Sequence, residues 1–222
     1  LSEEYTAVQQ PLYSTLPEAE DMKLATGCKN IRIASRTNQR IIMLNKGADD
    51  KGFIVCKDCG AAMPGDDISV LNDINRPYKS KYARSKCRHS NCFNVNLGYD
   101  FITDMLILEF TIDDKIIDAR RNDNPWLNRA AQSLSEALRL VASKRLDVEF
   151  TELVTGYRLR TASEASYVDI YLYDSLSSGA GYAVSVADAI AELLTDMKEL
   201  LSSCDCGSAC SKCLKHYRNQ YV

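Results

Sequence analysis

The residues with the clearest chemical potential are cysteines, of which the chain has nine. Four of them stand near the C-terminus, spaced as Cys-x-Cys, three residues, then Cys-x-x-Cys: Cys204, Cys206, Cys210 and Cys213. Four thiolates at this spacing can surround one tetrahedral zinc ion at Zn–S distances of about 2.3 Å. Because all four ligands are thiolates, no position remains for a catalytic water, and a zinc ion held here is structural.

A second candidate metal site lies upstream, in the pairs Cys56, Cys59, Cys87 and Cys92. The first pair forms a Cys-x-x-Cys-Gly knuckle, in which Gly60 lets the backbone turn so that its amides point at thiolate sulfur. His89 is an alternative ligand in the second half, but we expect it to be an exposed side chain on a basic loop. Together the two sites predict two zinc ions per chain.

Disulfides are the competing interpretation of these pairs. They need an oxidising compartment, and no basic and apolar leader can be read at the start of the sequence. Pairs at metal-ligand spacing without a leader favour zinc. A run of about 18 apolar residues is also missing, so we expect no membrane-spanning helix and a cytoplasmic location.

The formal net charge of −3 gives no overall attraction to nucleic acid, so a contact would have to be local. One basic run with interleaved tyrosines overlaps the second cysteine pair: Lys79, Lys81, Arg84, Lys86 and Arg88. Cationic and aromatic side chains in one segment suit the phosphates and bases of DNA or RNA. The alternative is a solvated charged loop, which is the commoner use of such a run.

Two features raise the question of catalysis. Three aspartates near predicted strand ends could serve a metal-dependent nuclease or hydrolase: Asp104, Asp169 and Asp174. The loop that follows is rich in serine and glycine, and the amides of Ser175, Gly179 and Gly181 could bind an anion, although the loop lacks the ending of a P-loop. Both histidines lie beside cysteine clusters, which leaves none for a Ser-His-Asp triad. We therefore expect a non-catalytic protein, with the nuclease as the alternative.

Hydrophobic periodicity predicts the elements that must position these groups. Apolar runs of strand length occur over 38–45, 53–55, 104–112, 147–153, 157–161 and 167–173. The last of these alternates strictly, so Val168, Ile170 and Leu172 should face a core. The opposite face carries tyrosines that are exposed or covered by a partner: Tyr167, Tyr171 and Tyr173. That face supports a second alternative, a pure protein-interaction module.

Two long helices complete the prediction. Asn124 and Pro125 are a capping residue and a first-turn proline, and apolar residues from Trp126 onward place one face of 126–144 on the sheet. The second helix runs from Tyr182 to about Leu201, directly before the C-terminal cysteines. The fold class is therefore α+β: a mostly antiparallel sheet packed by two long helices, with a zinc-ribbon insertion and a C-terminal four-cysteine zinc site. The predicted domains are an arm over 1–35, a strand segment with the ribbon over 36–100, and an α+β domain over 101–222.

Two C-terminal segments together resemble a known family. They are residues 173–182 (Tyr-Asp-Ser-Leu-Ser-Ser-Gly-Ala-Gly-Tyr) and residues 204–220 (Cys-x-Cys-x-x-x-Cys-x-x-Cys-Leu-x-x-Tyr-x-Asn-Gln). The pattern resembles the MrfA-type helicase zinc-binding domain of DEAD/DEAH-type helicases and anti-phage defence proteins. Upstream, residues 37–41, the Cys56 knuckle and residues 97–104 resemble the segment before this domain in the DrmB component of DISARM and in Druantia helicases.

The resemblance implies that the four C-terminal cysteines take the positions of the family's zinc ligands. It also implies a helicase ATPase core as partner, in cis or in trans, contact with DNA, and a role in antiviral defence or DNA repair. The chain departs from the family in having Ser177 and Ser178 where Pro-Gly is frequent, which affects the turn and not the metal. Helicase motifs are absent from these residues, so the expected role is a zinc-binding accessory domain that scaffolds the motor.

Overall fold

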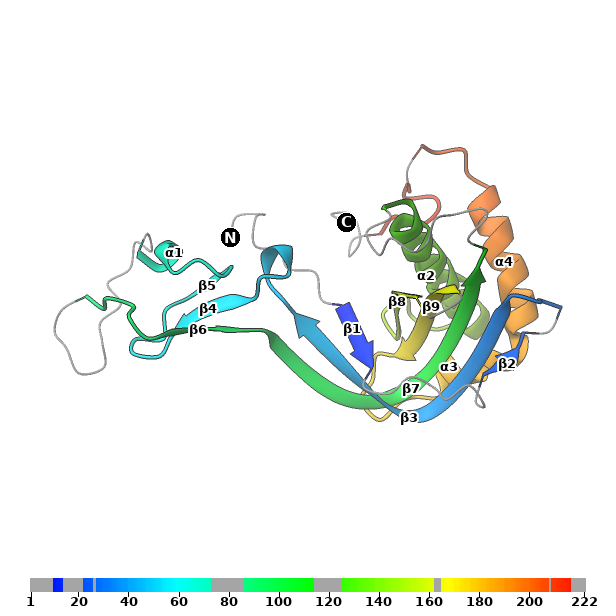
Figure 1. The fold of residues 1–222 in the computed structure, drawn as a ribbon. Coiled ribbons are helices and arrows are strands. Elements are labelled where there is room, and N and C mark those ends of the chain that lie inside the picture. Colours follow the sequence, from blue (N-terminus) through cyan, green and yellow to red (C-terminus); the bar gives the residue numbers. More distant parts are fainter. Residues whose placement is uncertain are drawn as a thin grey trace. The chain divides into compact units, whose positions relative to one another are not determined.

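A computed structural model describes residues 10–13, 22–25, 27–72, 86–113, 125–161, 165–207 and 209–216 (Figure 1). The chain divides into two compact units, Leu1–Leu12 with Ile42–Asp100, and Tyr13–Ile41 with Phe101–Val222. The arm predicted over 1–35 is not separate throughout, because Ala25 is buried in the core of the second unit. No helix in the described ranges is both long enough and apolar enough to cross a membrane.

The larger of the two sheets has six strands. Its strands are β1 (Gln10–Tyr13), β2 (Lys23–Leu24), β3 (Ile31–Asn45), β7 (Leu97–Ile112), β8 (Leu153–Thr161) and β9 (Ser166–Asp174). The order is β1-β3-β7-β9-β8, with β2 paired to β3. β9 is antiparallel to both neighbours, with Leu172 opposite Leu106 of β7 and Thr155 of β8. β9 is buried on both faces, with only Tyr167 half-buried.

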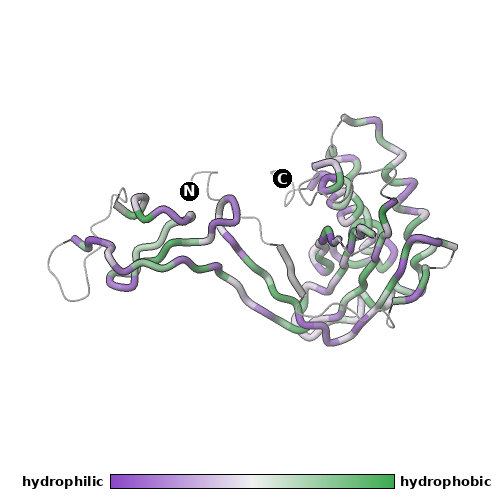
Figure 2. The backbone as a smooth tube through the Cα atoms, in the orientation of Figure 1, coloured by the Kyte–Doolittle hydropathy of each residue, from purple (hydrophilic) through white to green (hydrophobic). Residues whose placement is uncertain are grey.

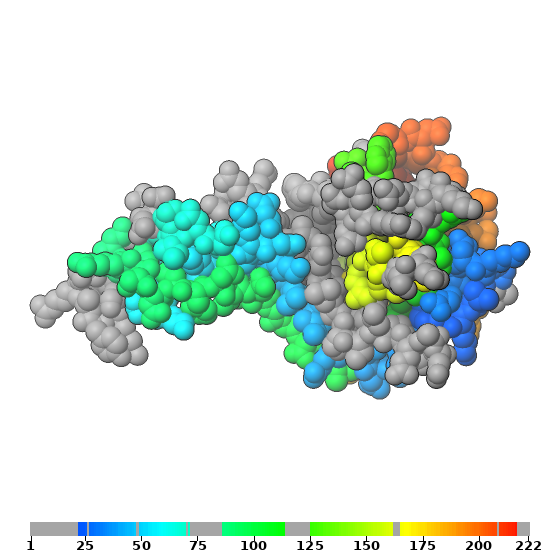
Figure 3. Space-filling view, in the orientation of Figure 1, coloured from blue at the N-terminus to red at the C-terminus, as the bar shows by residue number. Residues whose placement is uncertain are grey.

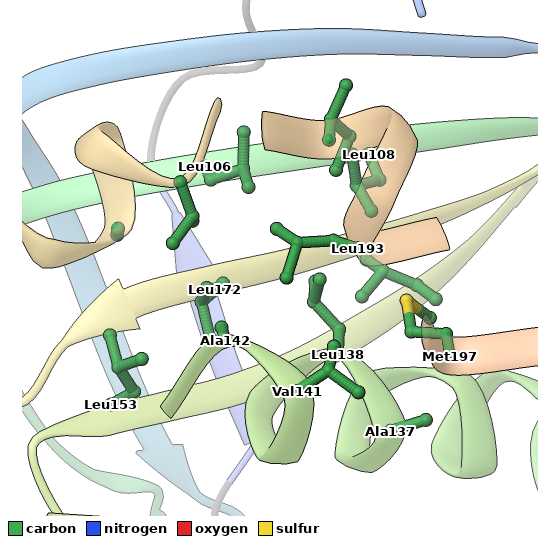
Figure 4. Close-up of a cluster of buried hydrophobic side chains, with 14 of the residues drawn as sticks. Leu106, Leu108, Ala137, Leu138, Val141, Ala142, Leu153, Leu172, Leu193 and Met197 are labelled. Carbon is green, nitrogen blue, oxygen red and sulfur yellow. The ribbon is translucent and has the colours of Figure 1, made fainter. Parts of the chain in front are cut away.

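Two helices, α2 (Pro125–Leu146) and α4 (Ile190–Ser202), enclose the main core with one face of the sheet (Figure 4). Strand alternation directs Leu106, Leu108 and Leu172 toward the helices. The helices contribute residues at helical spacing, among them Leu138, Ala142, Leu193 and Met197. This confirms the predicted α+β class and the core face of residues 167–173.

Three predicted elements differ in detail. The strand predicted over 147–153 is absent, since residues 147–152 lie in turns and irregular chain, and a single strand, β8, begins at Leu153 and continues through the bend predicted near Thr155 and Gly156. The helix predicted from Tyr182 is three pieces: α3 (Tyr182–Ser185), a 3-10 turn η4 (Ala187–Ala189) and α4. The chain bends there so that Ala183, Val186 and Ile190 can all reach the core.

Two predictions about aromatic residues are wrong. Trp126 is 75% exposed in the first turn of α2, with the Arg129 guanidinium 5.8 Å from its ring centroid, so it is not a core residue. Tyr171 and Tyr173 are buried, and only Tyr167 is half-buried, beneath Arg160 at 4.4 Å. The tyrosine face is therefore covered within the chain and does not support a free docking surface.

The ribbon segment of the first unit is a three-stranded antiparallel sheet. It consists of β4 (Phe53–Cys56), β5 (Ala62–Pro64) and β6 (Cys92–Val95) in the order β5-β4-β6, preceded by the 3-10 turn η3 (Ala48–Asp50) and accompanied by α1 (Ser69–Asn72). Its small core contains Ile54, Ala61 and Leu71 together with Cys56 and Cys87. A core of this size contributes little stability, so a bound metal ion would add to the stability of this sheet.

Candidate metal centres

The C-terminal cluster follows α4 directly and is built by a local turn. The backbone amides of Cys213 and Lys215 donate to the Cys210 carbonyl, and the Cys210 amide points at Cys213 Sγ at 3.2 Å. The Sγ atoms of Cys204 and Cys210 lie 3.6 Å apart, and those of Cys206 and Cys213 lie 3.7 Å apart. The edge of a tetrahedron with Zn–S bonds of about 2.3 Å is about 3.8 Å. The cluster therefore fits zinc. These Sγ–Sγ distances are too long for disulfides, whose S–S bond is about 2.05 Å.

The loop after the cluster is fixed to α2. His216 Nε2 lies 3.1 Å from Glu136 Oε2, and its ring packs edge-on against Phe150 with centroids 4.7 Å apart. The Arg139 guanidinium lies over the Phe150 ring, 3.8 Å from its centroid, and donates to the Phe150 carbonyl at 2.9 Å. His216 is thus a neighbour of the cluster, and its role is to hold the zinc loop against the helix.

Two thiols of the C-terminal cluster have pKa values shifted in opposite directions. The backbone amide of Cys210 lowers the pKa of Cys213 to about 7. The pKa of Cys206 rises to about 12, chiefly through its hydrogen bond to Cys204. One thiolate near neutral pH opposes ionisation of its neighbour, and a bound cation removes that opposition.

The ribbon cluster combines three cysteines with a histidine: Cys56, Cys59, Cys87 and His89. Their ligand atoms all lie within 4.8 Å of one another. The Sγ atoms of Cys56 and Cys87 are 3.7 Å apart, and Cys59 Sγ is 3.6 Å from His89 Nδ1. These distances match the edges of a tetrahedral zinc site with three sulfur ligands and one nitrogen ligand.

His89 occupies the place expected for Cys92, and it is buried rather than exposed, at 2% of its surface. Cys92 lies beside the cluster, opposite Cys56 as the first residue of β6: burial and then the neighbouring Cys56 thiol raise the pKa of Cys92, and its thiol donates to the His89 carbonyl at 3.1 Å. His89 adopts a left-handed backbone, φ 51°, which turns its ring toward the other ligands. The Cys-x-His spacing of residues 87–89 was the signal in the sequence.

Burial raises the pKa of the Cys56 thiol, but hydrogen bonds from His89 and from the amides of Cys59 and Asp58 outweigh it and lower the pKa to about 6. Burial raises the pKa of Cys59 to about 11. The lowered pKa favours the thiolate form of Cys56. A thiolate is the form in which cysteine binds metal.

Substitutions of His89 and Cys92 test which of the two residues is the fourth zinc ligand of the ribbon cluster. We expect His89→Ala to lower the zinc content from two ions to one, because it removes one of the four converging donors. Cys92→Ala should retain both ions, because four other donors already converge in the cluster and the Cys92 thiol beside them donates to the His89 carbonyl. Elemental analysis of the purified chains measures this directly. Loss of zinc from Cys92→Ala with retention in His89→Ala would restore the assignment expected from the sequence.

The three amides predicted to bind an anion in the loop after β9 are hydrogen-bonded within the chain. The amide of Ser175 donates to Glu152, that of Gly179 to Leu176 and that of Gly181 to Asp104. The amides of Ala180, Tyr182 and Ala183 all donate to the Asp174 carboxylate, at 2.6, 3.1 and 2.8 Å. A Cβ at Gly179 would overlap the Asp104 carboxylate. The anion site predicted at this loop is therefore filled by the chain's own carboxylates.

The aspartates that suggested a nuclease all have structural partners. Asp104 and Asp174 are buried and accept the loop amides, while Asp104 also accepts the amide of Asn38 at 3.2 Å. Asp169 is buried beside Arg160, whose Nε lies 2.9 Å from its carboxylate, and Arg160 also contacts Glu109. Within the described residues these groups do not form a cluster of ligands open to a metal ion. Each of the three carboxylates therefore has hydrogen-bond or ion-pair partners within the chain.

Only the end of the basic run falls within the described residues. Lys79, Lys81 and Arg84 lie outside the described residues, whereas Lys86 and Arg88 are exposed on either side of Cys87. DNA or RNA contact at this run therefore stays a prediction.

The C-terminal cluster lies in a segment that matches a known family. Residues 134–214, which include the four C-terminal cysteines, match the MrfA Zn-binding domain. Over 234 aligned residues the chain is 34% identical to the Druantia protein DruE of Escherichia coli (strain UMEA 4076-1). The match covers 99% of this chain and 13% of that relative, so the chain spans a small part of its length.

The fold has a counterpart among solved structures. It is similar to a crystal structure of the DUF1998 helicase MrfA bound to DNA, with a TM-score of 0.56 and 12% sequence identity. The similarity covers 98% of this chain and 24% of the helicase chain.

Proposed function

Because residues 134–214 carry an MrfA Zn-binding domain, we propose that this chain is a non-catalytic zinc-bearing module of a DEAD/DEAH-type DNA helicase system. In this role it scaffolds an ATP-driven core, in cis or in trans, and contacts DNA during anti-phage defence or DNA repair. The relatives support the proposal, since one is a Druantia protein and another is a helicase bound to DNA.

The observation that carries the proposal is the attachment of the C-terminal cluster to α2. Four thiols at zinc spacing leave no position for a water, and His216 and Glu136 connect the loop to the helix that packs on the sheet. Zinc in such a place stiffens one surface of the domain and carries out no reaction. A stiff surface formed by α2, α4 and the zinc loop is suited to hold a second domain in a fixed orientation.

The test combines the chain with the helicase core of its own system and measures ATPase activity with and without DNA. We expect the chain alone to hydrolyse no ATP and, with Mg²⁺ present, to leave DNA uncut. A Cys210→Ser, Cys213→Ser double variant should weaken stimulation by DNA about 5- to 150-fold, which is the usual range of coupling between sites. Cys28→Ala is the matched control, because Cys28 belongs to neither cluster.

Two results would count against this function. Metal-dependent cleavage of DNA by the chain alone would revive the nuclease alternative. Equal stimulation of the core with the wild-type chain and the double variant would show that the zinc loop has no part in supporting the motor.

A further inference from the structure

The ribbon cluster has one donor more than a tetrahedral zinc ion uses. Four donors converge in it, which is the number that zinc takes in a structural site: Cys56, Cys59, Cys87 and His89. Cys92 lies beside them, and its thiol donates to the His89 carbonyl at 3.1 Å. Cys92 therefore keeps its thiol when the other four donors hold an ion.

Strand pairing sets this extra thiol directly opposite one of the ligands. Cys56 is the last residue of β4 and Cys92 the first residue of β6, and the two are partners in the antiparallel register. The next pair is hydrogen-bonded, since the Lys57 amide donates to the Asn91 carbonyl at 2.9 Å. Cys56 and Cys92 are therefore a non-hydrogen-bonded pair, with side chains on the same face and Cα atoms about 4.5 Å apart. A disulfide spans Cα separations of about 4.4–6.8 Å, so these two cysteines are placed to form one.

The two sulfurs differ in their access to solvent. Cys56 is fully buried, at the end of a strand that is hydrophobic throughout (Figure 2). Cys92 is only half-buried, and the green segment that includes β6 lies at the surface of this unit (Figure 3). Burial and then the Cys56 thiol raise the pKa of Cys92, so its oxidation needs an oxidant in excess. A small oxidant reaches Cys92 before it reaches Cys56.

We propose that Cys92 is an oxidation site, at which hydrogen peroxide joins it to Cys56 and thereby releases the zinc ion of the ribbon cluster. The Cys92 thiol takes one oxygen from the peroxide, whose O–O bond breaks, to give a sulfenic acid and water. The Cys56 thiolate then attacks the Cys92 sulfur and the S–S bond forms. The hydroxyl group leaves with a proton from solvent as a second water, and one peroxide molecule has accepted two electrons from the two sulfurs.

The disulfide removes one ligand and leaves three donors for the ion: Cys59, Cys87 and His89. Zinc binding requires the deprotonated ligands and is coupled to folding of the segments that supply them. The new bond joins β4 to β6, whereas the turn at Cys59 and residues 87–89 lose the ion that connects them. Oxidation therefore destabilises one part of the ribbon and keeps these two strands paired. This inference goes beyond the proposed function, which depends on the C-terminal cluster.

A hydrogen peroxide titration of the zinc-loaded chain tests the proposal. Released zinc is followed with a chromogenic chelator, and cysteine pairs are mapped by peptide mass spectrometry. We expect the wild type to lose its ribbon zinc and to yield a peptide in which Cys56 is linked to Cys92. Reduction and added zinc should restore the ion. The same titration of the Cys210→Ser, Cys213→Ser variant assigns the released ion, because only the ribbon cluster is complete in that chain.

Cys92→Ala is the informative variant. It should keep its ribbon zinc at the peroxide concentration that empties the site of the wild type, because no thiol then lies opposite Cys56. Cys28→Ala is the matched control, since it removes a half-buried thiol outside both clusters and should respond as the wild type does.

Four results would overturn the inference. The wild type keeps its ribbon zinc in excess peroxide, or Cys92→Ala loses it as readily as the wild type, or Cys56 is found linked to Cys59 or Cys87 instead of Cys92. A Cys92→Ala chain that lacks the ribbon zinc before peroxide is added would show that Cys92 is itself a ligand. None of these measurements involves ATPase activity, so they leave the proposed function to its own test.

Discussion

Replacing Cys213 by serine is expected to lower the zinc content from two ions to one and to release residues 203–216 from α2. Cys213 belongs to the C-terminal cluster, and its Sγ lies 3.7 Å from that of both Cys206 and Cys210. Structural zinc binding contributes about 10–16 kcal/mol in small zinc domains, and this free energy is coupled to folding of the segment that supplies the ligands.

The loss should nevertheless be local. Ile190, Leu193 and Met197 of α4 are buried in the main core, so packing and not zinc holds the first three turns of this helix. Hydrogen exchange should therefore show lost protection over 203–216 and in the last turn of α4, with protection retained around Leu193. Chelation of the wild-type chain should produce the same pattern.

Cys28→Ala supplies the control, because it removes a thiol outside both clusters and should keep two zinc ions. Two ions in Cys213→Ser, or unchanged exchange over 203–216 after chelation, would contradict the assignment of this cluster.

Replacing Asp174 by alanine is expected to destabilise the second unit by about 3–5 kcal/mol. The carboxylate is fully buried and accepts three backbone amides from the loop that leads into α3. Hydrogen bonds to a charged acceptor contribute about 1.5–3 kcal/mol each, and the three amides would be left without their partner in the protein interior. Thr103, which donates to the Asp174 carbonyl, ties the same residue to β7.

Urea unfolding measures this loss as a lower transition midpoint with an unchanged slope. Asp174→Asn should lie between alanine and the wild type, because its amide group keeps one acceptor oxygen and turns a donor toward the loop amides. Asp188→Asn, at an exposed position of η4, is the control and should change stability by less than about 0.5 kcal/mol. A midpoint for Asp174→Ala equal to that of the control would show that this carboxylate does not hold the loop.

Comparison of β9 with its neighbours shows which parts of the fold could be predicted from the sequence. The alternation of Val168, Ile170 and Leu172 predicted their core face correctly, since this pattern depends only on the period of a strand. The same alternation could not say what covers Tyr171 and Tyr173, which are buried within the chain. Burial of the second face depends on segments that are distant in the sequence.

The ribbon cluster shows the same limit at a site. Cys56, Cys59 and Cys87 were predicted from spacing, but the structure brings His89 to Cys59 as the fourth converging donor, and the Cys92 thiol donates to the His89 carbonyl. Likewise the loop after β9 has the composition of an anion site. The structure shows instead that Asp104, far away in the sequence on β7, accepts one of its amides.

The sequence by itself determined the C-terminal cluster, the α+β class and the family resemblance, because these depend on ligands within ten residues of one another and on local periodicity. Only the tertiary structure decided that His89 completes the ribbon cluster, that Asp104 and Asp174 bind the chain's own amides, and that Trp126 is exposed. The physical reason is that ligands close together in the sequence are brought to one metal ion by a local turn, whatever the rest of the chain does. The partners of a buried polar group, by contrast, are set by the register and packing of strands that meet only after the chain has folded.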